Sequence, residues 1–109
     1  MKRYAAALAL LAPCLFGITP EIDKAKAEGN PAAPVVMEVF ASFDCPHCRD
    51  LHDQTIPLIV RDYVKTGKVY LVYREFPLSG QYHPHARDAA NYAVAAGRVG
   101  KYTDVANAL

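Results

Sequence analysis

Two cysteines separated by two residues, Cys45 and Cys48, are the residues of this sequence best suited to chemistry. A thiolate attacks disulfides, and two neighbouring thiols can form and release a disulfide between themselves. A Cys45–Cys48 disulfide would close a very short loop, which removes little entropy from the unfolded chain and adds little stability. The pair therefore predicts redox chemistry, with this disulfide as the redox-active group and no separate cofactor.

The residues around the pair favour a reactive thiol at Cys45. Pro46 suits the first position of a helix, so the helix should begin directly after Cys45. Unpaired backbone N–H groups and the positive end of the helix dipole then face Cys45, whereas Cys48 lies one turn further on, on the more buried side. The dipole supplies about 0.3–2 kcal/mol, at most about 1.5 pK units, so Pro46 and His47 should contribute as well.

These features predict a Cys45 pKa well below about 7. Stabilising the thiolate stabilises the reduced state, so the disulfide should be an oxidant. Cys45 would then be the attacking or attacked sulfur, and Cys48 would resolve the mixed disulfide.

A zinc half-site or a chance pair are the alternatives for Cys45 and Cys48. The obvious further zinc ligands are His83 and His85, but their spacing lacks the usual three to five intervening residues. A predicted strand also separates them from the cysteines. We therefore interpret His52, His83 and His85 as surface or helix-capping residues.

The segments around the pair predict a βαβ unit. Residues 35–41 are apolar at nearly every position, which predicts a strand covered on both faces. Apolar spacing after the pair predicts a helix from Pro46 to about Lys65, kinked near Pro57. Residues 68–74 are β-branched and aromatic and predict a second strand, parallel to the first.

Two more helices are expected after this unit. Pro84 opens an alanine-rich helix that Gly97 ends, and residues 102–109 begin another. One face of the first helix carries Ala86, Ala90, Ala93 and Val94. With residues 28–34 as a polar lead-in, a two-stranded sheet on three helices should fold weakly unless a partner supplies the missing edge.

Composition places the chain among ordinary globular proteins. It has 109 residues, of which 52% are hydrophobic and 21% charged, enough for one domain at most. The formal net charge of +1 gives no electrostatic argument for nucleic acid as a partner.

Residues 1–27 have the layout of a secretory signal peptide. A basic start precedes the apolar run 5–18, and Ala25-Lys26-Ala27 suits cleavage after Ala27. The alternative is a membrane anchor, but this run spans only about 21 Å of helix against a bilayer core of about 30 Å. A periplasmic or secreted protein is therefore expected.

Cys14 permits a lipoprotein interpretation of the same segment. The residues before it resemble a lipobox, but Pro13 stands where a small residue is expected. Cleavage after Ala27 would instead remove Cys14 and leave Cys45 and Cys48 as the only thiols. The pair would then meet no competing thiol of its own chain.

Several separated motifs resemble the DsbA-like branch of the thioredoxin superfamily. They are Cys45-Pro46-His47-Cys48, Thr55-Ile56-Pro57, Gly67-Lys68-Val69, Arg74-Glu75-Phe76-Pro77-Leu78 and His83-Pro84-His85-Ala86. The resemblance covers residues 35–109 and implies an α/β fold, a thioredoxin-like βαβ unit followed by the start of a helical insertion. It implies Cys45 as nucleophile, Cys48 as resolver and Pro46-His47 as the pair that sets the redox potential. It also implies exported thiol-containing proteins as substrates and a membrane protein as redox partner.

Two positions depart from the family's pattern. The family usually carries a buried acid six residues before the first cysteine, and that position is Val39. The neighbouring Glu38 should point to the opposite face of the strand, so we expect a strand-edge or register role more than proton transfer. The family also continues into a proline loop and a closing hairpin, but no proline follows Pro84, so the domain is expected to be truncated.

The expected function is thus exported thiol–disulfide exchange. One alternative is a non-catalytic remnant or fragment of such an enzyme, in which the thiol pair persists without a substrate groove. A small zinc-binding module is the other.

Overall fold

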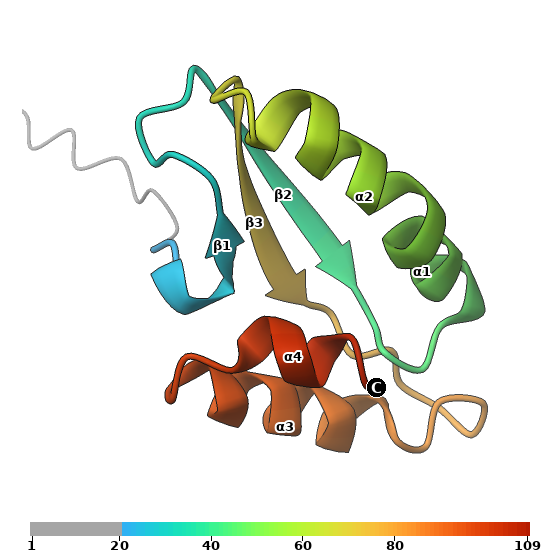
Figure 1. Ribbon diagram of the computed structural model, residues 1–109. Coiled ribbons are helices and arrows are strands. Elements are labelled where there is room, and N and C mark those ends of the chain that lie inside the picture. The colour runs from blue at the N-terminus through green and yellow to red at the C-terminus, as the bar shows by residue number, and fades with distance from the viewer. Residues whose placement is uncertain (1–20) are drawn as a thin grey trace, which may run out of the picture.

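A small mixed sheet forms the centre of the computed structural model, which describes residues 21–109. Its strands are β1 (Ala27–Glu28), β2 (Val35–Ala41) and β3 (Val69–Glu75), in the order β1-β3-β2. β2 and β3 are parallel, as predicted, and β1 pairs with β3 in the antiparallel direction. Figure 1 shows the two long strands pointing the same way, so their carboxyl ends meet at one edge of the domain.

The two long strands also end in register. Val35 pairs with Val69 at one end and Ala41 with Glu75 at the other, without a bulge between them. The loop that carries the cysteine pair and the loop that leads to the last helices therefore leave the sheet side by side. The Phe76 N–H donates to the Ala41 carbonyl at 2.8 Å and extends this pairing by one residue.

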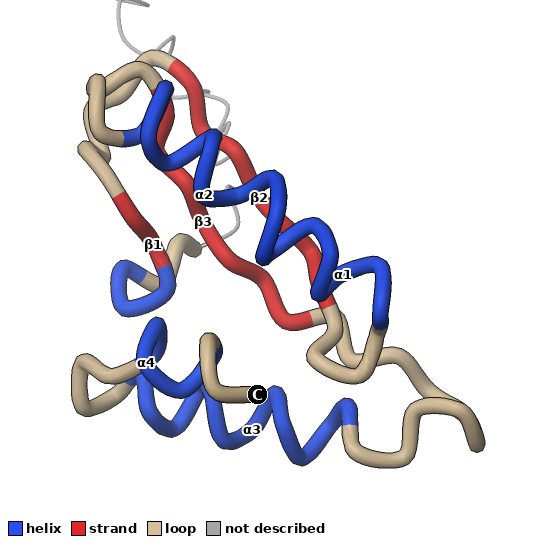
Figure 2. Tube along the Cα trace, turned by 45° about the vertical axis from the view of Figure 1, so that its right-hand side comes forward, coloured by secondary structure: helices blue, strands red, loops and turns tan. Residues whose placement is uncertain are grey.

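One continuous helical run connects β2 to β3 and covers one face of the sheet (Figure 2). It comprises α1 (Pro46–Asp50), a wider π-type segment (Leu51–Thr55), α2 (Ile56–Ile59) and a second π-type segment (Val60–Val64). The helix ends one residue before the predicted Lys65. Gly67 follows with φ +76°, a left-handed conformation that glycine adopts without steric cost.

The helix continues through Pro57. Near this residue, where a kink is predicted, the structure has a wider, π-type turn. Proline has no N–H, and its ring would crowd the carbonyl four residues earlier. Directly before it, the Ile56 N–H donates to the Leu51 carbonyl, five residues back. Such π-type turns are a known way for a helix to absorb a local misfit.

The core lies between this helical run and the sheet. Its buried members are Val39, Ile56, Val64, Val69 and Leu71, and Leu71 is completely buried. The prediction that β2 is covered on both faces is wrong for the described residues. Val36 and Phe40, on the face away from the helical run, are 50% and 59% exposed, whereas Tyr70 and Val72 of β3 on the same face are buried.

Two helices lie beyond the carboxyl ends of β2 and β3 (Figures 1 and 2). They are α3 (Ala86–Gly97) and α4 (Tyr102–Ala106), close to the predicted ranges. Three alanines of α3 are buried on the predicted face: Ala86, Ala90 and Ala93. Gly97, the last residue of α3, is also buried and lies against Tyr102 of α4.

The third strand, β1, lies across the predicted boundary between signal peptide and lead-in, so the expectation of a two-stranded sheet is wrong. β1 is only two residues long, too short to show a periodic pattern. Gly29, directly after it, has φ +99°, and a Cβ there would lie 2.7 Å from Val64 Cγ1. A glycine is required at this position because both the backbone conformation and the space exclude a side chain.

Most of the predicted signal peptide, residues 1–20, lies outside the described residues. The expected cleavage position after Ala27 falls inside β1, and Lys26 before it forms an ion pair with Glu75. Within residues 21–109, no helix is both long and apolar enough to cross a membrane. Residues 21–27 therefore make contacts with the domain that cleavage after Ala27 would remove.

Candidate functional site

Cys45 occupies the position directly before helix α1, as predicted. Its backbone is extended, with φ −117° and ψ 115°, and Pro46 is the first helical residue. The Cys45 N–H donates to the Ser42 carbonyl at 3.3 Å, and the Cys45 carbonyl accepts from the Arg49 N–H at 3.1 Å. Hydrogen bonds of its own N–H and carbonyl groups therefore hold Cys45 at the start of the helix.

The two thiols have opposite environments. Both are free and partly exposed, so the structure represents the reduced state. A hydrogen bond with the Cys48 thiol lowers the pKa of Cys45, as do hydrogen bonds from the backbone N–H groups of Cys48 and then His47. Burial raises the pKa of Cys48. The structure therefore gives the direction that the sequence predicts, with Cys45 the more acidic thiol.

Pro46 and His47 lie on the exposed start of the helix. The sequence predicts that His47 helps to stabilise the thiolate. In the structure, the part of His47 that lowers the pKa of Cys45 is its backbone N–H. The contribution of Pro46 is to begin the helix, which directs these N–H groups toward the sulfur.

Ser42 is part of this site, although no sequence pattern indicates it. It is only 4% exposed, and its hydroxyl oxygen accepts a hydrogen bond from the Leu78 N–H at 3.3 Å. Its own backbone N–H bonds to the Cys48 sulfur and opposes the effect of burial on the pKa of that thiol. A single serine in a loop has no sequence signature, and its partners come from the fold.

Replacing Ser42 with alanine should lower the free energy of unfolding by about 1 kcal/mol, because the Leu78 N–H loses its acceptor. Urea denaturation of the reduced protein measures this change. Ser79→Ala is the matched control, since Ser79 is exposed. Equal midpoints for the two variants would show that the Ser42 hydroxyl does not hold the two loops together.

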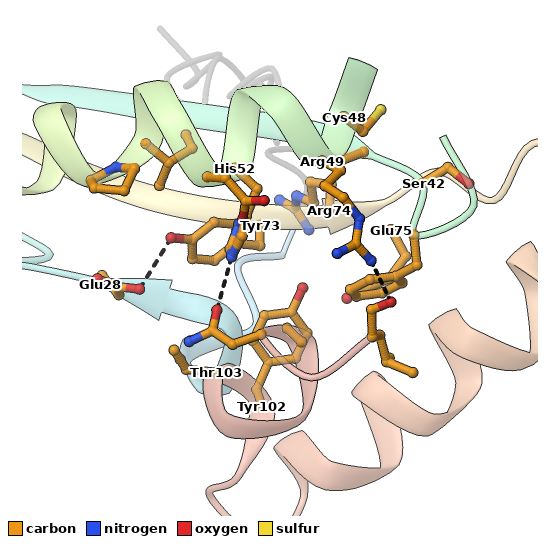
Figure 3. A pocket seen from close by; sticks show the side chains of 18 of the residues that line it. Glu28, Ser42, Cys48, Arg49, His52, Tyr73, Arg74, Glu75, Tyr102 and Thr103 are labelled. Atoms are coloured by element: carbon orange, nitrogen blue, oxygen red, sulfur yellow. Dashed lines mark hydrogen bonds between the residues drawn. The ribbon is translucent and has the colours of Figure 1, made fainter. Parts of the chain in front are cut away.

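A cavity of about 250 Å³ opens next to Cys48, between the helical run, β3 and α4 (Figure 3). Ile56, Val60 and Ala106 give it apolar walls, and polar groups of Glu75 and Tyr102 also reach it. Cys48, the less acidic thiol, therefore lies at the edge of this cavity and is partly exposed.

Buried polar groups cluster on the far side of this cavity. Glu75 forms an ion pair with Lys26, and their side chains are only 10% and 11% exposed. The Tyr73 hydroxyl donates to Glu28 at 3.1 Å. Burial, and next the neighbouring carboxylates, raise the pKa values of both Tyr73 and Tyr102 above the ordinary tyrosine value, so both stay neutral and can donate hydrogen bonds.

Glu38 lies away from the thiols, on the face of β2 opposite the helical run. It forms an ion pair with Arg74 of β3, with 2.7 Å between Arg74 Nη2 and Glu38 Oε1. Val39 occupies the core position below the cysteine loop. This arrangement agrees with the register role predicted for Glu38 and places no acid at Val39.

The three other histidines have different surroundings, and His85 is exposed directly before α3 without a side-chain capping bond. His52 Nε2 lies 2.8 Å from Asn107 Oδ1 on the exposed surface (Figure 3). His83 is half-buried, and its Nδ1 lies 2.8 Å from the Asp44 carbonyl oxygen, so its predicted role as a surface or capping residue is incomplete. Residues 21–109 contain no group of three His, Cys, Asp or Glu side chains that could hold a metal ion.

Several proteins that are similar to this chain have names that refer to disulfide chemistry, and others are named Na(+)/H(+) antiporter NhaA. A family described as thioredoxin matches residues 23–109. Probable disulfide bond formation protein D of Bacillus cereus is 36% identical over 53 residues, 49% of this chain and 24% of that protein. A putative protein-disulfide oxidoreductase of Rickettsia conorii is 32% identical over 79 residues, 72% of this chain and 27% of that protein.

A solved structure agrees with these relatives. The crystal structure of alpha-DsbA1 from Wolbachia pipientis matches with a TM-score of 0.63 and 31% identity, over 74% of this chain and 39% of that one. This chain spans about a quarter of the length of the two curated relatives above. On the family match, the shared fold and the thiol pair at the start of its first long helix, the chain belongs to the DsbA-like branch of the thioredoxin superfamily.

Proposed function

We propose that this chain exchanges disulfides with thiol-containing proteins through Cys45 and Cys48. The observation that supports this most strongly is the opposite direction of the two pKa shifts, lowered for Cys45 and raised for Cys48. A sulfur that becomes an anion readily is both a good leaving group and a ready target for exchange.

In the proposed reaction the oxidised chain starts with a Cys45–Cys48 disulfide. A substrate thiolate attacks Cys45 Sγ, an S–S bond forms between them, and Cys48 leaves as a thiolate that takes up a proton. A second thiolate of the substrate attacks its own sulfur in this mixed disulfide. The substrate gains a disulfide, Cys45 leaves as a thiolate, and the chain is left with two reduced cysteines.

The direction proposed for this exchange is oxidation of the substrate. Interactions that stabilise the Cys45 thiolate exist only in the reduced protein, so they favour the reduced state and make the disulfide a stronger oxidant. Pro46 and His47 contribute by starting the helix and supplying a backbone N–H, respectively.

The proposed location of this chain is the periplasm or the outside of the cell, after cleavage of its residues 1–27. Its proposed substrates are other exported proteins. Two relatives carry names that refer to disulfide formation or protein-disulfide oxidation. A membrane protein that reoxidises Cys45 and Cys48 completes the proposed cycle. Nucleic acid is not a proposed partner, because the net charge is only +1.

The test is oxidation of a reduced, unfolded protein that contains several cysteines. The oxidised chain should form disulfides in it faster than a Cys45→Ala variant does, as measured by the loss of free thiols. Equal rates for the two chains would overturn the proposal. They would favour the alternative of a non-catalytic remnant.

A further inference from the structure

Two loops that are distant in the sequence meet directly before Cys45. Residues 42–45 leave β2, and residues 76–85 leave β3 at the same edge of the sheet (Figure 1). Besides the bond from Leu78 to Ser42, two hydrogen bonds join these loops at Asp44. His83 Nδ1 lies 2.8 Å from the Asp44 carbonyl oxygen, and the His85 N–H donates to Asp44 Oδ2 at 3.3 Å.

The bond from His83 has only one possible direction. A carbonyl oxygen accepts and cannot donate, so Nδ1 of His83 must carry the hydrogen. The ring therefore donates from Nδ1 in either protonation state. The His83 N–H donates to the Gly80 carbonyl at 3.1 Å, and this turn holds the backbone that carries the ring.

The group that His83 holds belongs to the peptide that precedes the reactive cysteine. The Asp44 carbonyl and the Cys45 N–H are parts of one rigid peptide plane. His83 binds this plane at its oxygen, and the Ser42 carbonyl accepts from its N–H at 3.3 Å. With both ends of the plane fixed, the direction in which the Cys45 side chain leaves the backbone is fixed as well.

We propose that His83 is a positioning residue for Cys45, acting through its Nδ1–H on the Asp44 carbonyl. This bond keeps the Cys45 sulfur in line with the backbone N–H groups of His47 and Cys48. The biological purpose of this arrangement rests on the proposed disulfide exchange, but the arrangement itself can be tested without any substrate.

The test compares three replacements of His83 in the full chain. Asparagine places an amide N–H close to the position of Nδ1, glutamine places it close to the position of Nε2, and leucine has no donor. The measurements are the pH profile of thiolate absorbance and the equilibrium constant of the cysteine pair with glutathione. His85→Leu is the matched control, because His85 contributes only its backbone N–H to Asp44.

His83→Leu and His83→Gln should shift the thiolate profile to higher pH and lower the oxidising equilibrium constant about fivefold, the usual effect of one lost hydrogen bond. His83→Asn and His85→Leu should match the natural chain. A natural profile for His83→Leu or His83→Gln would overturn the proposal, as would equal shifts in all three His83 variants. If leucine prevents folding, the comparison of asparagine with glutamine decides in the same way.

This experiment also separates the inference from the proposed function. If the His83 variants show the predicted pattern but the natural chain oxidises no substrate, the positioning role is supported and the exchange function is overturned. If the natural chain oxidises substrate but the thiolate profiles of the His83 variants are unchanged, the exchange function is supported and the positioning role is overturned.

Discussion

A chain with Cys45→Ser should lose disulfide exchange by about a thousandfold or more, because the hydroxyl forms no disulfide and is a far weaker nucleophile. The serine is similar in size, so the helix start and the loop before it should be preserved. The oxidation of a reduced multi-cysteine protein measures the loss, and circular dichroism checks the fold.

Cys48→Ser is the informative comparison for this prediction. Its Cys45 can still enter a mixed disulfide, but no second thiol is available to release the partner. Mass spectrometry should therefore detect a stable adduct of this variant with a small-molecule disulfide, and no adduct with Cys45→Ser. An adduct on Cys48 in the Cys45→Ser chain, formed as fast as that on Cys45, would assign the roles the other way round.

The substitution Lys26→Met should lower the free energy of unfolding by about 3 kcal/mol or more, the usual effect of leaving one charge of a buried pair alone. Lys26 and Glu75 are each about nine-tenths buried, and Glu75 Oε1 has no hydrogen-bond partner in the described part of the chain. Removing the cation leaves this carboxylate buried with only the Tyr102 hydroxyl beside it and no opposite charge. Urea denaturation of the reduced protein at neutral pH measures the effect.

Two variants control this result. Lys24→Met removes a charge from an exposed position nearby and should change stability by less than about 0.5 kcal/mol. Adding Glu75→Gln to Lys26→Met removes the uncompensated charge and should restore most of the loss. If Lys26→Met is as stable as Lys24→Met, the ion pair does not contribute to folding.

The same ion pair bears on the predicted export signal. Cleavage after Ala27 would remove Lys26 and, with Ala27, half of β1. A chain that starts at Glu28 should therefore show the same loss of stability as Lys26→Met. Mass determination of the protein recovered from the periplasm or culture medium would give the cleavage position directly.

Local sequence patterns were sufficient to predict the elements that carry the thiols. The apolar run of residues 35–41 predicted β2 at the bounds seen in the structure, and Pro46 predicted the helix start at Cys45. The parallel pairing followed from the strand–helix–strand order. These features depend on neighbouring residues, so the sequence contains them directly.

Features that depend on distant contacts were missed. β1 is a strand only because β3 lies beside it, and the exposure of Phe40 depends on how other elements pack on that face of the sheet, not on its own strand. The partner of His83 is 39 residues away, and that of Lys26 is 49 residues away. Side-chain types alone do not indicate which loops will meet, so neither contact had a signal in the sequence.

The acidity of the Cys45 thiol is the property on which the proposed chemistry depends. Because its pKa is lowered in the folded chain, the reduced protein binds fewer protons than the unfolded chain between the two pKa values. The stability of the reduced protein should therefore rise with pH across that interval, and it should lose this contribution as the pH falls through the folded pKa.

The most direct measurement is a thiol titration of the reduced protein, in which the rate of Cys45 alkylation or the thiolate absorbance is followed against pH. We expect Cys45 to titrate clearly below the ordinary cysteine range, and Cys48 at a clearly higher pH than Cys45. A Cys45 pKa of about 8 or above, the range of an ordinary cysteine, would contradict this expectation.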